Sequence, residues 1–386
     1  MLKVDRGEVV NLLTRLIEIE SVNPNMEGGT GESKIAGFIA GQLESIGMEV
    51  YTQEVIDGRF NVIGILRGEG GGPNLMMNGH IDTVSVKGMI TDPFRTFIEN
   101  DNIHGRGACD MKGAIAAMII AVKALVDSGI KLKGDLLLSG VVDEEYESLG
   151  TEKLIQKYRS DAVVIGEPTD LQVGIAHKGF VWLEVETFGK AAHGSVPESG
   201  IDAIANMAKV ITSLGTLEES YTKKKHKLVG VPNIHSSAIQ GGSEWSIIPD
   251  FCRLKLERRT VPGEISSIVM DEINQIFRRL SKEDPLFRAR VKKVFERQPM
   301  EIASNETVVK NLRLAIQEIR RTTPRLIGVP YWTDASLFVN KVSIPTCLFG
   351  PGDINLAHSA DEYIKIGDVV DSAKIYALAA QNFCGT

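Results

Sequence analysis

The segment Leu136–Gly150, LLLSGVVDEEYESLG, constrains the fold more than any other part of the chain. Its first half is a near-continuous apolar run, which is typical of a strand covered on both faces. The run ends in the acids Asp143, Glu144 and Glu145. Adjacent carboxylates at the end of a buried strand repel one another, and desolvating them is costly unless something offsets their charge. Solvent, a basic side chain or a metal ion could do so.

Helical and strand-like patterns alternate through the first part of the chain. A first amphipathic helix includes residues 9–17, a second runs from about 32 to 46, and a third contains residues 114–122. Strand-like runs lie at 61–66 and 74–78, and a further one precedes the acids at 136–142. This alternation predicts an α/β fold in which helices flank a sheet.

The pattern changes after the sequence GIAHKG. The next run, FVWLEVETFG, alternates like a half-exposed antiparallel strand. Two helices, near 202–214 and 265–280, and two further strands, near 234–239 and 252–256, follow it. The α/β alternation returns from Val291 onward. We therefore expect a discontinuous larger domain, 1–178 and 291–386, with a smaller α+β domain inserted at 179–290.

Composition excludes several classes of protein. The 386 residues suggest two domains, and 43% hydrophobic with 24% charged residues is typical of a soluble globular protein. A net charge of -7 argues against nucleic-acid binding. The chain shows no transmembrane run and no signal peptide, and its four cysteines form no C-x-x-C pair. We expect reduced thiols and a cytoplasmic protein that does not enter a membrane.

Four other segments place a metal-binding type of side chain at a strand end or a turn. They are NLMMNGHIDTV, GRGACDMKGAIAAM, DAVVIGEPTD and FGPGDINLAHSADEY. Functional groups of open α/β sheets gather where strands end. We therefore expect one site that collects His80, Asp110, Glu145, Glu167 and His358.

Each of these residues has a simpler explanation when it is taken alone. Asp110 could cap a helix, Glu167 could be a loop acid, and His358 could belong to a surface pair with Asp361 and Glu362. Recurrence at five positions favours a shared site. Lys112 is the one close cation in sequence, and it cannot neutralise so many carboxylates.

The donor types favour a transition metal. Two imidazoles and three carboxylates suit zinc or a similar ion, whereas calcium prefers oxygen ligands alone. Five ligands exceed one tetrahedral site, but they can serve two ions if one carboxylate bridges them. Asp82 lies two residues after His80, where it can hydrogen-bond the second ring nitrogen and fix the tautomer.

Several motifs occur in order along nearly the whole chain: GHIDTV, DPF, GRGACDMKG, DEE, GEPTD, AHKG, ERRTVPGE and FGPG followed by AHSADEY. With them the chain resembles the dinuclear-zinc amidohydrolases and metallopeptidases that include acetylornithine deacetylase, succinyl-diaminopimelate desuccinylase, aminoacylase and glutamate carboxypeptidase. The resemblance implies a zinc-peptidase-like mixed sheet flanked by helices. It also implies that the inserted α+β domain is a lid through which two chains form a homodimer.

The resemblance also implies a role for each site residue. His80 and Glu167 would bind one zinc, Glu145 and His358 the other, and Asp110 would bridge them, with cobalt as a possible substitute. Glu144 would be the general base and His193 the oxyanion donor. Arg259 would hold a substrate carboxylate, with Arg258 as a competitor. The remaining implied positions are Asp82 beside the catalytic site and Gly350 and Gly352 along the substrate.

The implied activity is metal-dependent hydrolysis of an amide bond in an N-acyl amino acid, as in the deacetylases and desuccinylases. A dipeptidase or carboxypeptidase with the same site is the alternative, and a catalytically silent binding protein is a third reading. The chain departs from the desuccinylase pattern at Ile90 and Ser246 and after the acid pair, at Glu147 and Ser148. These positions concern substrate recognition more than metal binding, so the acyl group and the amine stay open.

Overall fold

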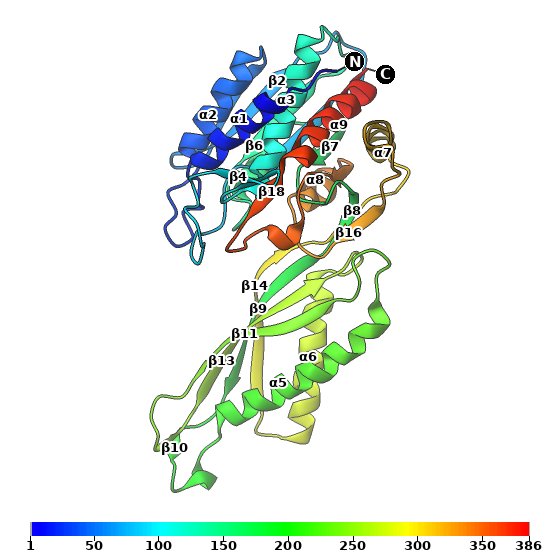
Figure 1. The fold of residues 1–386 in the computed structure, drawn as a ribbon. Coiled ribbons are helices and arrows are strands. Elements are labelled where there is room, and N and C mark those ends of the chain that lie inside the picture. The colour runs from blue at the N-terminus through cyan, green and yellow to red at the C-terminus, as the bar shows by residue number, and fades with distance from the viewer. Residues whose placement is uncertain (1, 386) are drawn as a thin grey trace. The chain divides into compact units, whose positions relative to one another are not determined.

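Residues 2–385 are described by a computed structural model, and they divide into two compact units (Figure 1). The first unit comprises residues 2–175, 302–327 and 333–385, and the second comprises 176–301 and 328–332. Each unit has its own sheet and its own helices. They are described separately below.

The first unit is built on a mixed sheet whose strands run in the order β1-β2-β6-β3-β7-β17-β8. The central pairs of β3 with β6 and β7, and of β7 with β17, are parallel, whereas β1, β2 and β6 pair antiparallel. The strands are β1 (Glu49–Ile56), β2 (Arg59–Leu66), β3 (Leu75–His80), β6 (Leu136–Val141), β7 (Ala162–Ile165), β8 (Val173–His177) and β17 (Thr346–Leu348). A smaller antiparallel sheet contains β4 (Phe97–Glu99), β5 (Asn102–His104) and β18 (Tyr363–Lys365).

Helices flank this sheet, as the alternation of patterns predicted. All residues of β3, β6 and β7 are buried, which explains their near-continuous apolar sequences. The helices α3 and α9 pack against each other, and α2 packs against β2. The helices of this unit are α1 (Arg6–Glu18), α2 (Ser33–Ser45), α3 (Gly113–Asp127), α4 (Leu149–Lys157), α7 (Thr307–Arg320), α8 (Ala335–Val342) and α9 (Ile366–Cys384). The predicted α/β fold with a mixed, helix-flanked sheet is confirmed.

Local sequence signals set the bounds of the first two helices. Asp5 caps α1, because its side chain accepts a hydrogen bond of 2.9 Å from the backbone N–H of Glu8. The apolar stripe of α1 is buried as its periodicity predicted. After α2 the chain turns at Gly47, whose φ of 83° suits glycine and ends the helix.

The second unit is an antiparallel sheet in the order β11-β13-β9-β14, with α5 and α6 in its core. The alternation of β9 turns Val181, Leu183 and Val185 toward apolar residues of the two helices, among them Met207 and Ile273. The elements are β9 (Gly179–Phe188), β10 (Ala192–His193), α5 (Ala203–Ser220), β11 (Asn233–Gly241), β12 (Ile247–Ile248), β13 (Phe251–Thr260), α6 (Ser266–Glu283) and β14 (Arg288–Arg297). The short strands β15 (Met300–Glu301) and β16 (Leu326–Val329) pair with β8.

The second unit extends beyond the segment 179–290 that the sequence assigned to an inserted domain. Strand β14 pairs with β9 from Arg288↔Phe188 to Arg297↔Phe180, so residues after Arg290 continue the same sheet. The return of strand-like sequence at Val291 therefore marks this fourth strand. A lid or dimerisation role for the unit stays a prediction.

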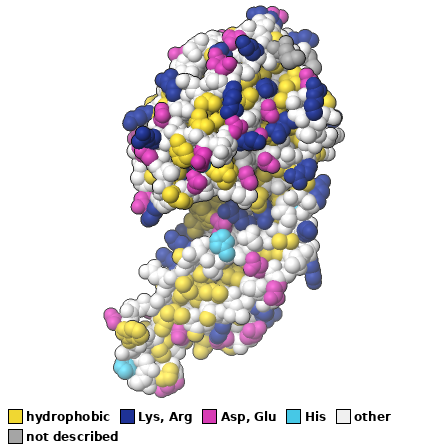
Figure 2. All heavy atoms as spheres, in the orientation of Figure 1, with side chains coloured by type: hydrophobic (Ala, Val, Ile, Leu, Met, Phe, Trp, Pro, Cys, Tyr) yellow, Lys and Arg dark blue, Asp and Glu magenta, His cyan; other side chains and the backbone are white. Residues whose placement is uncertain are grey.

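Three further properties bear on the class of protein. The helices between residues 2 and 385 include none with both the length and the apolar character needed to cross a bilayer. On the face drawn in Figure 2, basic and acidic side chains are interspersed over the first unit. The four cysteines are buried, and their thiols are free.

Candidate metal centre

Strand ends bring the predicted ligands together in the first unit. His80 is the last residue of β3, Glu145 follows β6, and Glu167 follows β7. Because β6, β3 and β7 are adjacent and parallel, their carboxyl ends meet at one edge of the sheet. Donor atoms of His80, Asp110 and Glu145 lie within 4.8 Å of one another. A second group within 4.8 Å consists of His80, Glu144 and Glu167.

The Asp110 carboxylate lies between the two histidines. Its Oδ1 is 3.0 Å from Nε2 of His80, and its Oδ2 is 3.3 Å from Nε2 of His358. His358 Nε2 is also 3.0 Å from Oε1 of Glu145. Asp110 does not cap α3, since the residue before that helix is Lys112. Its two oxygens instead face two different imidazoles, which is the arrangement that a bridging carboxylate requires.

Hydrogen bonding and burial shift the protonation of the site. Burial disfavours the charged imidazole of His358, but hydrogen bonds to Asp110 and Glu145 outweigh it and raise the pKa of His358 to about 11. Burial also disfavours the charged imidazole of His80, but its interactions with Asp110 and Asp82 raise its pKa well above the usual value. Burial opposes ionisation of Asp110, yet its hydrogen bonds with the two histidines hold its pKa below the usual range.

Glu144 and Glu167 are the carboxylates without a basic partner. Burial, followed by the charge of Glu167, raises the pKa of Glu144 well above its usual value, and burial with the charge of Asp110 does the same for Glu167. Among residues 2–385, neither carboxylate forms an ion pair with a lysine or an arginine. Lys112 donates to the backbone oxygen of Ile19 (2.8 Å), and burial lowers its pKa to about 7. A divalent cation therefore fits this donor set better than the basic side chains do.

Asp82 supports the site through two sets of contacts. The ring nitrogen Nδ1 of His80 is 2.9 Å from the backbone oxygen of Asp82 and 3.6 Å from its carboxylate. Burial opposes ionisation of Asp82, but its interaction with His80 lowers its pKa. The carboxylate also accepts the backbone N–H groups of Glu144 and Glu145, each at 3.2 Å. Asp82 therefore faces His80 as expected and in addition holds the main chain of the acid pair, and its role in fixing the tautomer stays a prediction.

Glu362 is a functional residue that the sequence reasoning missed. The prediction weighed it only as one member of a surface pair with His358. In the structure Glu362 is buried. Its carboxylate accepts a hydrogen bond from the Arg106 guanidinium (2.6 Å) and others from the backbone N–H groups of Gly107, Cys109 and Asp110 at 2.9 to 3.1 Å. Glu362 thereby holds the turn that carries Asp110. Its position in the motif AHSADEY was the feature of the sequence from which a supporting role could have been predicted.

Two predicted glycines pack against the ligand-bearing segments. A Cβ atom at Gly350 would lie 2.4 Å from the backbone oxygen of Gly166 and 2.6 Å from that of Glu167. A Cβ atom at Gly352, where φ is 96°, would lie 2.6 Å from Sγ of Cys109. Both positions therefore need glycine for close backbone approach. A substrate contact for this loop stays a prediction.

The remaining predicted residues belong to the second unit. His193 is exposed on β10, and its Nδ1 lies 2.7 Å from Oγ of Ser195. Arg259 donates to Glu257 (2.6 Å) and lies over the ring of Phe180. Their roles toward substrate stay predictions.

Arg258, the competitor of Arg259, is fully buried in the second unit. It donates to the hydroxyl of Tyr221 and to Glu264, each at 2.8 Å. Arg258 therefore belongs to a buried ion pair that supports the second unit. Arg259 remains the candidate for binding a substrate carboxylate.

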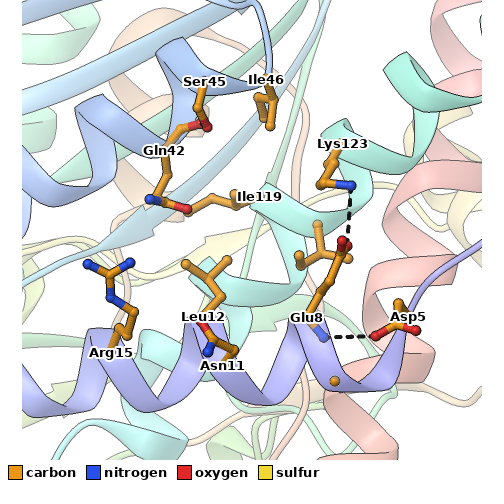
Figure 3. Close-up of a pocket in the computed structure, with 12 residues that line it drawn as sticks. Asp5, Glu8, Asn11, Leu12, Arg15, Gln42, Ser45, Ile46, Ile119 and Lys123 are labelled. Carbon is orange, nitrogen blue, oxygen red and sulfur yellow. Dashed lines mark hydrogen bonds and ion pairs between the residues drawn. The ribbon is translucent and has the colours of Figure 1, made fainter.

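A pocket of the first unit is a separate feature (Figure 3). It has a volume of about 510 Å³ and lies among α1, α2 and α3. Polar side chains such as Glu8, Arg15 and Lys123 surround an apolar floor that includes Leu12 and Ile119. It shares no lining residue with the metal centre, so it contributes no group to the chemistry there.

Imidazoles and carboxylates that converge at the ends of buried strands are the donor set of a metallohydrolase, and fold and site together define this class. The chain belongs to peptidase family M20/M25/M40, whose family model matches residues 76–382. The family predicted from the motifs is thereby confirmed, and the protein is a hydrolase of that family.

Relatives with different substrates match nearly the whole chain. The N-formyl-4-amino-5-aminomethyl-2-methylpyrimidine deformylase of Bacillus subtilis (strain 168) is 30% identical over 96% of this chain and 93% of its own. Acetylornithine deacetylase of Myxococcus xanthus is 28% identical over 97% of both chains. The YxeP protein of Bacillus subtilis, described as a dinuclear metal-binding peptidase from the M20 family, shares the fold with a TM-score of 0.76 at 17% identity, over 99% of each chain.

The raised pKa values predict how pH acts on the metal-free protein. Folding raises the pKa of Glu144 and Glu167 above the ordinary 4.5, and that of His358 above 6.5. At a pH between the ordinary and the folded pKa of a group, the folded chain therefore holds a proton that the unfolded chain has lost. Each of these groups therefore contributes stability that is lost as pH rises through its folded pKa. Lys112, whose pKa is lowered to about 7, acts in the opposite sense above that pH. Calorimetry in a chelator should show Tm falling from about pH 5 to about pH 7.

Zinc should reverse this trend, since metal binding displaces the protons. The gain in Tm on adding zinc should be larger at about pH 8 than at about pH 6. A metal-free Tm that rises with pH over this range would contradict the assignment of these side chains to one coupled site.

Proposed function

We propose that the chain is a metal-dependent amidohydrolase that removes a short acyl group from an N-acyl amino acid. The observation that carries the proposal is the position of Glu144. Its carboxylate lies within 4.8 Å of donor atoms of both His80 and Glu167, is half-buried, and has a raised pKa. Such a group is suited to accept a proton beside the metal ligands and to return it.

The proposed ligand set serves two metal ions, for which zinc is the proposed identity and cobalt a substitute. His80 and Glu167 would hold one ion, Glu145 and His358 the other, and Asp110 would bridge them. The contacts of the two Asp110 oxygens with different histidines support the bridge. When bound, the ions would polarise the acyl carbonyl and make water acidic enough to react near neutral pH.

The side chains of the protein would then carry the proton. Glu144 would accept a proton from the attacking water and deliver it to the leaving amine. We propose that His193 donates a hydrogen bond to the oxyanion, and that Arg259 binds a substrate carboxylate. The loop containing Gly350 and Gly352 would line the bound substrate.

The acyl group is the first property to test. The deformylase and deacetylase relatives remove one- and two-carbon acyl groups, as their names state, and support short N-acyl substrates for this chain. A panel of N-formyl, N-acetyl and N-succinyl amino acids with dipeptides, assayed with zinc and with cobalt, should show the highest kcat/KM on a short acyl group. Hydrolysis of dipeptides alone would establish the peptidase alternative. Metal binding without any hydrolysis would favour a binding protein.

The neighbouring acids should fail in different ways when each is replaced. Glu144→Gln keeps size but cannot accept the proton, so kcat should fall by about 10²–10⁴-fold while metal content and KM are kept. Steady-state kinetics with metal analysis of the purified variant gives the result.

Glu145→Gln is the matched variant one residue away. It removes a negative ligand, so one ion should bind more weakly and activity should partly return with excess zinc. The reverse pattern, with metal lost in Glu144→Gln and only turnover lost in Glu145→Gln, would exchange the two roles.

We also propose a homodimer formed through the second unit. Strand β11 is an edge of its sheet, and its residues from His235 to Gly241 are exposed. Ile239 on this strand and Ile204 and Ile211 on α5 are exposed apolar side chains, and such edges and patches favour association. Light scattering at micromolar concentration should give twice the mass of the 42.1 kDa chain, and a monomer would contradict the proposal. The buried free thiols support a cytoplasmic location.

A further inference from the structure

The direction of Glu144 and Glu145 depends on the turn that follows β6. Successive residues of a strand point to opposite faces, yet both of these side chains reach the donor groups around His80. The residue before them, Asp143, has a φ of 71°, in the left-handed region that residues other than glycine seldom adopt. This bend turns the chain out of the strand direction, so something must hold Asp143 in it.

The fully buried carboxylate of Asp143 makes the contacts that hold the bend. Its Oδ1 accepts hydrogen bonds from Arg59 Nη2 (2.9 Å) and Asn23 Nδ2 (3.0 Å). Its Oδ2 accepts the backbone N–H groups of Glu147 (3.3 Å) and Leu149 (3.4 Å). The carboxylate thus closes the turn on one side and fastens it to two distant segments on the other.

The same asparagine connects this turn to Asp82. Nδ2 of Asn23 also donates to Oδ2 of Asp82 at 2.8 Å. As described above, the Asp82 carboxylate accepts the backbone N–H groups of Glu144 and Glu145. The main chain of the acid pair is therefore held between two buried carboxylates that one amide group joins.

Arg59 supplies the positive charge for this network. It begins β2 and donates through Nε (2.8 Å) and Nη2 to the two oxygens of Glu32, a fully buried residue just before α2. Its Nη2 also donates to Asp143. Within the described chain, Arg59 is the basic side chain that pairs with Asp143. A planar guanidinium can span both carboxylates, whereas the single ammonium of a lysine cannot reproduce that fork.

We propose that Arg59 is a positioning residue for the acid pair. By holding Asp143, and through Asn23 and Asp82, it fixes the main chain from which Glu144 and Glu145 project. The inference rests on the proposed function only in taking these two acids as proton carrier and metal ligand. Among the described residues, the ion-pair partners of Arg59 are Glu32 and Asp143, and neither is a proposed metal ligand.

Arg59→Lys tests the proposal, because it keeps the charge and removes the fork. Arg67→Gln is the matched control: Arg67 directly follows the same strand and pairs with two acids, Glu49 and Asp135, each at 2.8 Å, but is half exposed. Cobalt binding to metal-free protein, followed by absorption against a competing chelator, is measured together with kcat, KM and the unfolding midpoint.

Arg59→Lys should weaken cobalt binding and lower kcat by about 10- to 100-fold each, with KM changed less than about twofold. Arg67→Gln should change none of these values. A structural ion pair alone would lower the unfolding midpoint and leave cobalt affinity and kcat unchanged, and that result overturns the proposal.

A second variant and a measurement on the wild-type protein complete the experiment. If Arg59→Lys does not fold, Asn23→Ala is measured in its place. This variant removes the link between Asp143 and Asp82 and retains Arg59, so it should show the same loss of cobalt affinity and kcat. Wild-type values of both in Asn23→Ala would overturn the proposal. If the wild-type protein itself binds no cobalt, the proposed function is refuted. Measuring the wild-type protein therefore distinguishes failure of the proposed function from failure of the positioning role of Arg59.

Discussion

Repulsion among buried carboxylates at the ends of β3, β6 and β7 is the constraint on which the rest of the structure depends. The site itself holds imidazoles rather than ammonium or guanidinium groups, and His80 and His358 carry the offsetting charge through their hydrogen bonds to Asp110 and Glu145. A divalent cation bound at the proposed site would take over this role and displace those protons. The acids can thus be packed together without being permanently neutralised.

The buried arginines of the first unit lie behind the site, where they hold main chain. Arg106 and Glu362 fix the turn that carries Asp110, and Arg59 with Asp143 fixes the turn that carries the acid pair. In both cases a buried carboxylate accepts backbone N–H groups next to a ligand, and an arginine balances that carboxylate. Preorganising the main chain in this way lets short side chains meet the narrow distance limits of a metal site.

The sequence predicts the elements, and it predicts which side chains gather at the site, because each leaves a local signal. Buried strands are apolar throughout, and the ligands follow them directly, as His80 does in β3. Two of the supporting residues leave no such signal, since Glu32 and Asn23 contact partners far away along the chain. The choice between Arg258 and Arg259 could have been made from the sequence. The alternation of β13 that buries Leu254 and Leu256 also buries Arg258, and it places Arg259 on the opposite face of the sheet.

The names of the relatives differ in the bond that is cut or in the group that is released, so we expect specificity to come from residues outside the proposed metal centre. The segments nearest the ligands have little freedom to provide it. Gly350 packs on the backbone of Gly166 and Glu167, and Gly352 packs on Cys109 beside Asp110, so a side chain at either glycine would displace a ligand-bearing segment. Substrate choice is therefore expected from side chains that are free to vary without moving this backbone, such as Ile90, which is exposed in the first unit, and Arg259 in the second.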